Sequence, residues 1–265
     1  MKNTKKIILL SAILLLLTAA IVYAQTSTAT VEKKDTKTVS AEMINKSSEI
    51  LSKLDTNTNI SKSNVKYDKF KNEDIYEVEN SKYFINLDSS NNLVGIYSKE
   101  VNPLKVRTKF DKNRAREIII NKYNELNLPS EYDLVYLEKI DDEIWEADFQ
   151  KNYNGVYNKY EAVKTFFIPE NDEIVSLTIF DEGHSNSQAT ISKDDAIMTA
   201  ANSLNIDSSE IISAELAMEK ANDFYDESNS DTSIHTSWVL QSADNSIVFV
   251  DAAENTVIGG DCINE

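Results

Sequence analysis

The chain has 265 residues, enough for one or two average domains or for several small ones, and carries 44 acidic against 27 basic side chains, a net charge of −17. Such an acidic surface repels phosphate, so the composition argues against a nucleic-acid partner. The chain has 5 glycines, and they are not arranged as a phosphate-binding glycine-rich loop. One cysteine and two histidines leave little material for a disulfide, a cysteine-based metal site or histidine-dependent catalysis. We therefore expect no cofactor, no metal and no catalytic residues.

Residues 1–24 have the pattern of an export signal. Three lysines precede an apolar run over residues 7–24, and the sequence VYA before Gln25 fits a signal-peptidase site. The alternative is an uncleaved anchor, because this run as a helix would span roughly 27 Å of a roughly 30 Å hydrocarbon core. Either outcome places the rest of the chain outside the cytoplasm, secreted or tethered to the membrane. Residues 25–39 are polar and threonine-rich, which predicts a flexible tether.

Three hairpin-like segments recur along the chain at a nearly constant spacing. Each has an apolar strand, a short polar turn and a second apolar strand, and the turns align at Asp88, Pro169 and Asp251. The spacings between these positions are 81 and 82 residues. Repetition with such a constant period predicts repeated structural units rather than one large core.

A helix is predicted upstream of each hairpin, because apolar residues recur there at intervals of three and four. Asp111 and Ser192 are the predicted N-caps of the second and third helices, and Pro129 closes the second. The three predicted apolar faces consist of Met43, Ser47, Ile50, Leu51 and Leu54, of Ala115, Ile119, Tyr123 and Leu126, and of Ala196, Ile197, Ala200, Ala201 and Leu204.

Alternating apolar and polar residues between each helix and its hairpin predict further strands. The segment 210–220 is ambiguous, because its residues favour a helix and only its place in the repeat makes it a strand. Each unit is therefore expected to be an α+β module, with one helix packed on an antiparallel sheet of three or four strands. The expected boundaries of these tandem modules are 40–105, 106–185 and 186–265.

The third unit resembles a PepSY domain. Its last hairpin, VFVDAAENTVI over residues 248–258, follows the family pattern V-x-V-D-A-x-T-G-x-V-I. Asn255 stands where glycine is usual, and asparagine tolerates the same positive φ. The middle unit, through residues 147–168, is similar to the propeptide modules of thermolysin-like proteases and to YcdB/YcdC-type repeated domains. The first unit resembles the family least.

The resemblance implies an extracytoplasmic module without catalytic residues, of a kind found in protease propeptides and in membrane-anchored tandem arrays. Inhibition or local regulation of proteases has been proposed for such modules. Membership of the family leaves the individual function open, because a fold does not by itself define a function.

The hairpin of the middle unit carries the candidate contact residues. Tyr153, Tyr157 and Tyr160 surround Gly155 in a hairpin longer than those of the other units. An elongated aromatic hairpin suits contact with a peptide or protein. The alternative is that these tyrosines cover their own sheet.

The other candidate functional residues give weaker evidence of a site. His184 lies in a polar segment without a nucleophile elbow, and His235 precedes a strand, so neither is expected to catalyse a reaction. The segment 226–231 has oxygen ligands at alternate positions but lacks the glycine and the glutamate of an EF-hand. Trp145 and Trp238 are expected in their cores.

Together these features favour a non-enzymatic, extracytoplasmic protein that binds a peptide or protein in the cell envelope, with a protease as the regulated partner. An N-terminal membrane contact is expected if the signal segment stays uncleaved. One alternative is a structural spacer at the cell surface, for which mutations of the tyrosine hairpin would have no effect on binding. The other is a carboxylate-dependent hydrolase, which would need two acids converging in a cleft.

Overall fold

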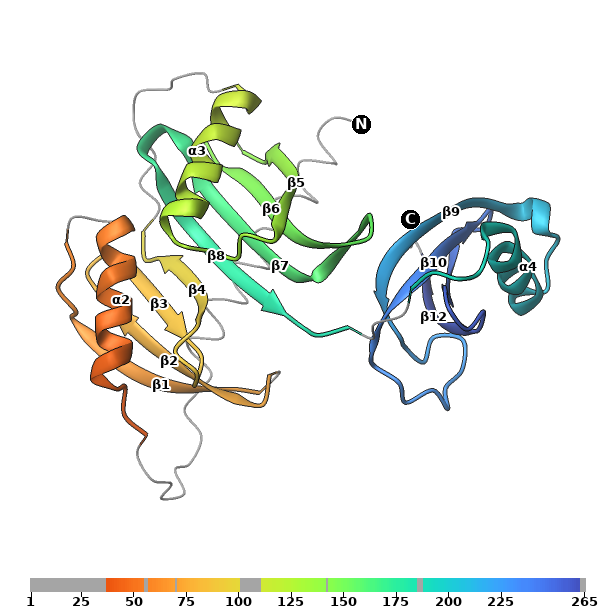
Figure 1. The fold of residues 1–265 in the computed structure, drawn as a ribbon, viewed down its shortest axis with the longest axis horizontal. Helices are drawn as coiled ribbons and strands as arrows, with labels where there is room; N and C mark the ends of the chain where they lie inside the picture. The colour runs from red at the N-terminus through yellow and green to blue at the C-terminus, as the bar shows by residue number, and fades with distance from the viewer. Residues whose placement is uncertain are drawn as a thin grey trace. The chain divides into compact units, whose positions relative to one another are not determined.

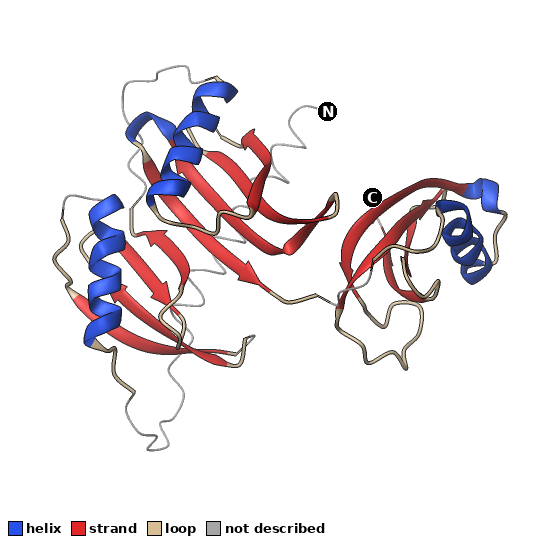
Figure 2. Cartoon of the chain, in the orientation of Figure 1, coloured by secondary structure: helices blue, strands red, loops and turns tan. Residues whose placement is uncertain are grey.

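A computed structural model describes residues 37–54, 57–69, 71–100, 111–141, 143–184 and 188–262. The chain divides into two units, Met1–Thr38 and Val39–Glu265, and the predicted export signal lies outside the described residues. Within the ranges given above, no helix is long and apolar enough to cross a membrane. The described part of the second unit is built from three α-helices and twelve β-strands (Figures 1 and 2).

One order of elements, a helix followed by four strands, occurs three times. The helices are α2 (Ala41–Leu54), α3 (Lys112–Glu125) and α4 (Lys193–Leu204). The first segment has the strands β1 (Lys62–Asp68), β2 (Glu73–Glu79), β3 (Tyr83–Leu87) and β4 (Leu93–Ser98). The second has β5 (Tyr132–Lys139), β6 (Trp145–Tyr153), β7 (Val156–Ile168) and β8 (Glu173–Asp181). The third has β9 (Ile211–Lys220), β10 (Ile234–Ser242), β11 (Ser246–Asp251) and β12 (Val257–Cys262).

Two of the helices begin at side-chain caps that the sequence predicts. Asp111 accepts a hydrogen bond from the backbone N–H of Arg114 at 2.8 Å, and Ser192 accepts one from that of Asp195 at 3.1 Å. Both predicted N-caps are thereby confirmed. Asn205 ends α4 in the left-handed conformation, with a φ of 55°.

The three aligned turns adopt a common backbone conformation near their ends. Asn91, Asp172 and Asn255 have φ values of 67°, 54° and 56°, so each supplies the left-handed residue that glycine often provides. Asp88 and Asp251 each accept two backbone hydrogen bonds through Oδ1 within their own turn. Asn255 therefore takes the positive φ predicted for it.

The first two sets of four strands form one continuous antiparallel sheet, in the order β1-β2-β3-β4-β8-β7-β6-β5. β4 joins β8 through the pairs Gly95 with Thr178, Ile96 with Leu177 and Tyr97 with Ser176. The third set forms a sheet of its own, in the order β12-β11-β10-β9. The fold is thus α+β with large antiparallel sheets, and its first two segments share a sheet where the repeat predicts two separate ones.

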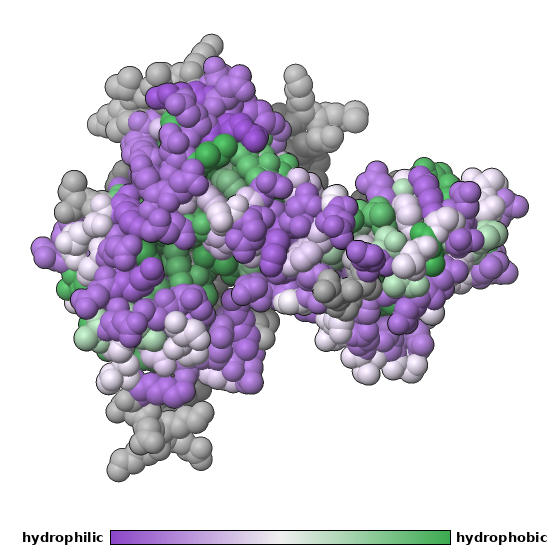
Figure 3. Space-filling model, viewed as in Figure 1, coloured by the Kyte–Doolittle hydropathy of each residue, from purple (hydrophilic) through white to green (hydrophobic). Residues whose placement is uncertain are grey.

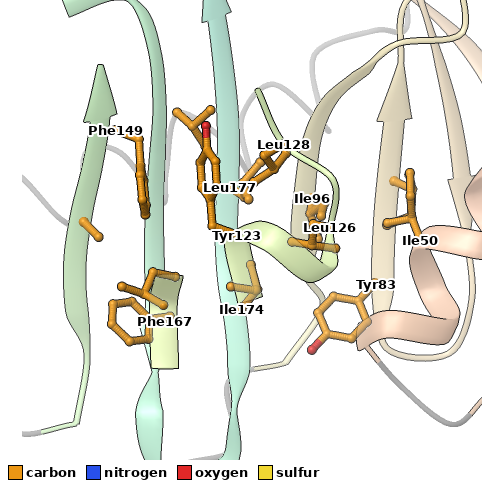
Figure 4. Close-up of a cluster of buried hydrophobic side chains, with 14 of the residues drawn as sticks. Ile50, Tyr83, Ile96, Tyr123, Leu126, Leu128, Phe149, Phe167, Ile174 and Leu177 are labelled. Carbon is orange, nitrogen blue, oxygen red and sulfur yellow. The ribbon is translucent and has the colours of Figure 1, made fainter. Parts of the chain in front are cut away.

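α2 and α3 cover the same face of the eight-stranded sheet (Figure 1), and their buried residues belong to one hydrophobic cluster. Figure 4 shows its side chains coming from both halves of the sheet, with Ile50 from α2 and Tyr123 from α3. The Tyr123 ring stacks on Phe149, with centroids 4.0 Å apart. Trp145 is buried in this cluster as predicted. On the molecular face drawn in Figure 3, most residues are hydrophilic, and hydrophobic ones appear between the two helices.

α4 packs on the third sheet through small residues. Ala196 and Ala200 are fully buried against Leu240, Val248 and Val250, so the helix approaches the strands closely. The helix-favouring segment at 210–220 forms β9, because its backbone pairs along nearly its whole length with β10. The prediction drawn from the repeat is therefore correct, and local propensity is overridden by strand pairing.

Candidate binding groove

The face of the third sheet opposite α4 carries a second hydrophobic cluster. Strand alternation directs Val239, Ile247 and Phe249 away from the α4 side, where they pack with Ala221 and Ile258. All of them except Ile258 line an open groove of about 690 Å³. An apolar floor of this kind can bury an apolar side chain of a ligand.

The loop between β9 and β10 forms one wall of the groove. Asn222 exchanges two hydrogen bonds with the backbone of Gly260, each 3.0 Å long. Tyr225 donates its hydroxyl to the carbonyl oxygen of Ile247 at 2.9 Å. Phe224 stands edge-on to Tyr225 and is 49% exposed at the lip of the groove. The loop is therefore held against the sheet and presents an aromatic side chain to solvent.

Gly260 permits this arrangement because it has no side chain. A Cβ atom at this position would lie 2.1 Å from the ring of Tyr225 and 2.3 Å from the carbonyl oxygen of Ile247. Both distances are far shorter than a van der Waals contact. The close approach of the loop to the sheet therefore requires glycine here.

Residues of the β6–β7 hairpin line the groove from another side. The register of β6 and β7 shifts between Gln150 and Lys151, which leaves residues 159–161 outside the ladder with β6. Lys159 places Nζ 2.7 and 2.8 Å from the two carboxylate oxygens of Glu219 on β9. The hydroxyl of Tyr160 lies 3.5 Å from the same carboxylate. The rim of the groove is therefore polar, in contrast to its floor.

The three tyrosines predicted as one contact surface lie in three different environments. Tyr153 donates its hydroxyl to Glu161 at 2.6 Å, and its ring lies against His184 with centroids 4.0 Å apart. Tyr157 is 39% exposed and directs its hydroxyl toward β5. Tyr160 is the member of the three that lines the groove, and burial raises the pKa of its hydroxyl.

Glu161 organises the base of the same hairpin. Its buried carboxylate accepts hydrogen bonds from Tyr153, from Asn158 at 2.8 Å and from Lys151 at 3.2 Å. Nδ1 of His184 lies 3.1 Å from Oε2 of this carboxylate. Burial favours the neutral acid, but the three donors outweigh it and hold the pKa of Glu161 below its ordinary value. His184 thus belongs to a hydrogen-bonded cluster that shapes the hairpin.

His235 also lies between carboxylates. Its Nδ1 is 2.7 Å from Oδ2 of Asp251, and its Nε2 is 3.1 Å from Oδ2 of Asp231. Both ring nitrogens are engaged, so neither is placed to accept a proton from a nucleophile. Asp226 and Asp231, two of the three acids in the segment 226–231, accept backbone hydrogen bonds from Ser228 and Ser233 of the same loop. Among the described residues, no three His, Cys, Asp or Glu side chains are grouped so that they could hold a metal ion.

Sequence reasoning did not identify the groove or its loop. Asn222, Phe224 and Tyr225 belong to no repeated motif, and the partners of Asn222 and Tyr225 on the sheet lie far along the chain. One signal was available, since Gly259 and Gly260 are adjacent in a chain with 5 glycines. A close approach of another segment to β12 could have been inferred from that pair.

The fold resembles that of a solved structure, the Bacillus megaterium YpeB C-terminal domain. The two chains superpose with a TM-score of 0.52 and 11% sequence identity, over 86% of this chain and 100% of that chain. That domain is PepSY-like, and the likeness therefore supports the PepSY-like fold at the level of architecture. No family model matches the sequence, and no curated protein matches it either.

Proposed function

We propose that this chain is a non-enzymatic, extracytoplasmic binding protein built of three tandem PepSY-like modules, and that it regulates an envelope protease by binding a peptide segment. The observation that carries the proposal is the groove above Phe249. It combines an apolar floor, the exposed ring of Phe224 and a rim of charged side chains. Such a groove can bury one side chain of a peptide while the rim pairs with its polar groups.

The tandem interpretation is supported by the threefold order of one helix and four strands. The left-handed residues Asn91, Asp172 and Asn255 also end the three aligned turns in one way. The likeness to the YpeB domain supports a PepSY-like architecture over most of the chain. The export pattern of residues 1–24 supports an extracytoplasmic location.

The chemistry of the described side chains supports binding rather than catalysis. Glu219, which lines the groove, is paired with Lys159 at 2.7 Å, and Lys220, another lining residue, is paired with Glu182 at 2.8 Å. A hydrolase acting through two carboxylates needs one acid that holds a proton and another that stays ionised across a cleft. Both carboxylates are engaged by lysines rather than facing another acid, so the arrangement favours binding.

A selection from a random heptapeptide library, followed by fluorescence anisotropy with the selected peptides, tests the proposal. Phe224→Ser and Tyr160→Ala are expected to weaken binding by about tenfold, because each removes an aromatic side chain that lines the groove. Tyr157→Ala is the matched control, because Tyr157 is an exposed tyrosine of the same hairpin that does not line the groove.

If the wild type and the two groove variants bound the selected peptides with equal affinity, the proposal would be contradicted. That result would favour the alternative of a structural spacer at the cell surface. All three substitutions concern side chains that are at least partly exposed, so each variant is expected to fold. Circular dichroism of each variant checks that expectation before binding is measured.

A further inference from the structure

The face of the eight-stranded sheet opposite α2 and α3 carries a group of acidic and aromatic side chains at its β5–β7 end. Trp145, Ala147 and Phe149 of β6 point into the helix-covered core, so the alternate residues Glu146 and Asp148 point to the opposite face. Strand register places Tyr136 and Glu138 of β5 directly beside Asp148 and Glu146, and Phe166 of β7 beside Glu146. We call these five residues the acidic-aromatic patch: Tyr136, Glu138, Glu146, Asp148 and Phe166.

Asp148 has an unused acceptor. The residue is 8% exposed, and no hydrogen-bond donor of the described residues reaches its buried Oδ1 atom. Its Oδ2 atom lies 3.6 Å from Nζ of Lys164, and that amine is 3.9 Å from Glu146. Both distances exceed that of a good hydrogen bond. A buried carboxylate oxygen without a donor is rare in folded proteins and calls for a missing partner.

The charge of the patch indicates what that partner is. Lys164 is shared between the two carboxylates of Glu146 and Asp148, and the other nearby amine, that of Lys112, already lies 2.7 Å from Glu138. Burial raises the pKa of Asp148, and burial followed by the charge of Asp148 raises that of Glu146. A cation placed between these two carboxylates would relieve both effects.

An arginine side chain fits these requirements better than a metal ion. Within the described residues, no metal-binding group of three His, Cys, Asp or Glu side chains occurs, and Glu146 and Asp148 would supply only two ligands. A guanidinium group offers five donors in one plane, which suits an acceptor that Lys164 leaves unsatisfied. Its flat face can also lie against an aromatic ring, and Tyr136, an exposed tyrosine, is adjacent to Asp148.

We propose that the acidic-aromatic patch binds an arginine-containing basic peptide, with one guanidinium group inserted between Asp148 and Glu146 against the ring of Tyr136. The acceptor is Oδ1 of Asp148, and the remaining guanidinium donors reach Glu146. Flanking basic residues of the peptide lie near Glu138. This site is separate from the groove of the third sheet and does not rest on the function proposed for that groove.

Fluorescence anisotropy with the full chain and a fluorescein-labelled octapeptide of alternating arginine and serine tests the proposal. Asp148→Asn is expected to weaken binding by at least about tenfold, because it removes a charged acceptor from a buried pair. Asp194→Asn is the matched control, because Asp194 is an exposed acid on α4 and its replacement changes the net charge equally. The control is expected to change the affinity less than about twofold.

Three results would overturn the proposal: no binding by the wild type, equal weakening in the two variants, or equal binding of an octapeptide in which lysine replaces arginine. The last would show that charge alone is recognised rather than the planar donor group. If Asp148→Asn fails to fold, Glu146→Gln carries the same test at a more exposed position. Comparing Tyr136→Ala with Tyr136→Phe then separates the role of the ring from that of its hydroxyl. We expect the phenylalanine variant to retain binding and the alanine variant to lose it.

Discussion

The carboxylate of Asp251 joins the imidazole of His235 to the turn between β11 and β12. Its Oδ2 atom lies 2.7 Å from Nδ1 of His235, while its Oδ1 atom accepts the backbone N–H groups of Ala253 and Glu254 at 2.7 and 2.9 Å. Asp251 is buried, so these partners replace the water that the carboxylate leaves on folding. One side chain therefore links a turn to a neighbouring strand.

Replacing Asp251 with alanine is expected to lower the free energy of unfolding of the third sheet by about 2 to 4 kcal/mol, because buried donors lose a charged acceptor. His235→Ala is expected to cost about half as much, since the turn amides keep their partner. Urea denaturation, followed by the fluorescence of Trp238 in a Trp145→Phe background, measures both. An equal loss in the two variants would contradict the linking role of the carboxylate.

Glu161 is expected to make the β6–β7 hairpin sensitive to acid. Its pKa in the folded state lies below its unfolded value of about 4.3, so the carboxylate stabilises the fold above that pH. This contribution is lost as the pH falls through the lower, folded pKa. The NMR signals of Tyr153, which donates to Glu161, report the change directly.

Glu161→Gln keeps the shape of the side chain but removes its charge, so the acid-dependent change in the Tyr153 signals should disappear. The stability of this variant at neutral pH is expected to fall by about 1 to 3 kcal/mol. An acid transition of the Tyr153 signals that survives in the variant would assign it to another carboxyl group.

Asp148 is expected to have the opposite effect on stability. Its pKa is raised by burial, so the contribution of Asp148 to stability is greatest below its unfolded pKa of about 3.9 and is lost as the pH rises through the raised folded pKa. Asp148→Asn should therefore be more stable than the wild type at neutral pH, by about 1 kcal/mol. Thermal denaturation at pH 7 and at pH 3.5 measures the difference, which should vanish at the lower pH.

A wild type more stable than Asp148→Asn at neutral pH would show that Lys164 already satisfies the carboxylate. The basic octapeptide should reverse the order of the two proteins, because a ligand that binds the folded wild type stabilises it. Stability and binding thus move in opposite directions for this substitution.

Gly260→Ala is expected to detach the loop that forms the wall of the groove. The added methyl group would meet the ring of Tyr225 and the carbonyl oxygen of Ile247, which is part of the β11 backbone and cannot turn aside. We expect a loss of about 1 to 3 kcal/mol in stability and weaker binding of groove peptides. Gly183→Ala is the control, because a Cβ atom there meets no other atom within 4 Å. Equal behaviour of the two alanine variants would contradict the close approach at Gly260.

Local sequence was enough to predict the helix faces, the caps at Asp111 and Ser192, and the turn conformation at Asn255, because these depend on residues a few positions apart. The repeat also identified β9 correctly against its helical propensity. The groove could not be predicted from the sequence, because the segments that form it come together only in the folded chain. Asn222 meets Gly260 across 38 positions, and Lys159 meets Glu219 across 60.

The pairing of β4 with β8 was unpredictable for a different reason. A strand at a sheet edge and a strand inside a sheet have the same alternation of side chains, so the periodicity of 93–98 does not reveal a second neighbour. The unsatisfied oxygen of Asp148 likewise leaves no trace in the alternation of β6. Both features belong to the backbone ladder and to packing, which a single sequence does not report.

The β4–β8 ladder also imposes an order on folding. When the first four strands have formed, β4 remains an open edge until β8 pairs with it. Because β8 is the last strand of the second segment, that whole segment must be present first. An open edge pairs readily with the same edge of another molecule. A chain that stops before residue 173 is therefore expected to associate with itself through β4, whereas the complete chain covers that edge with its own β8.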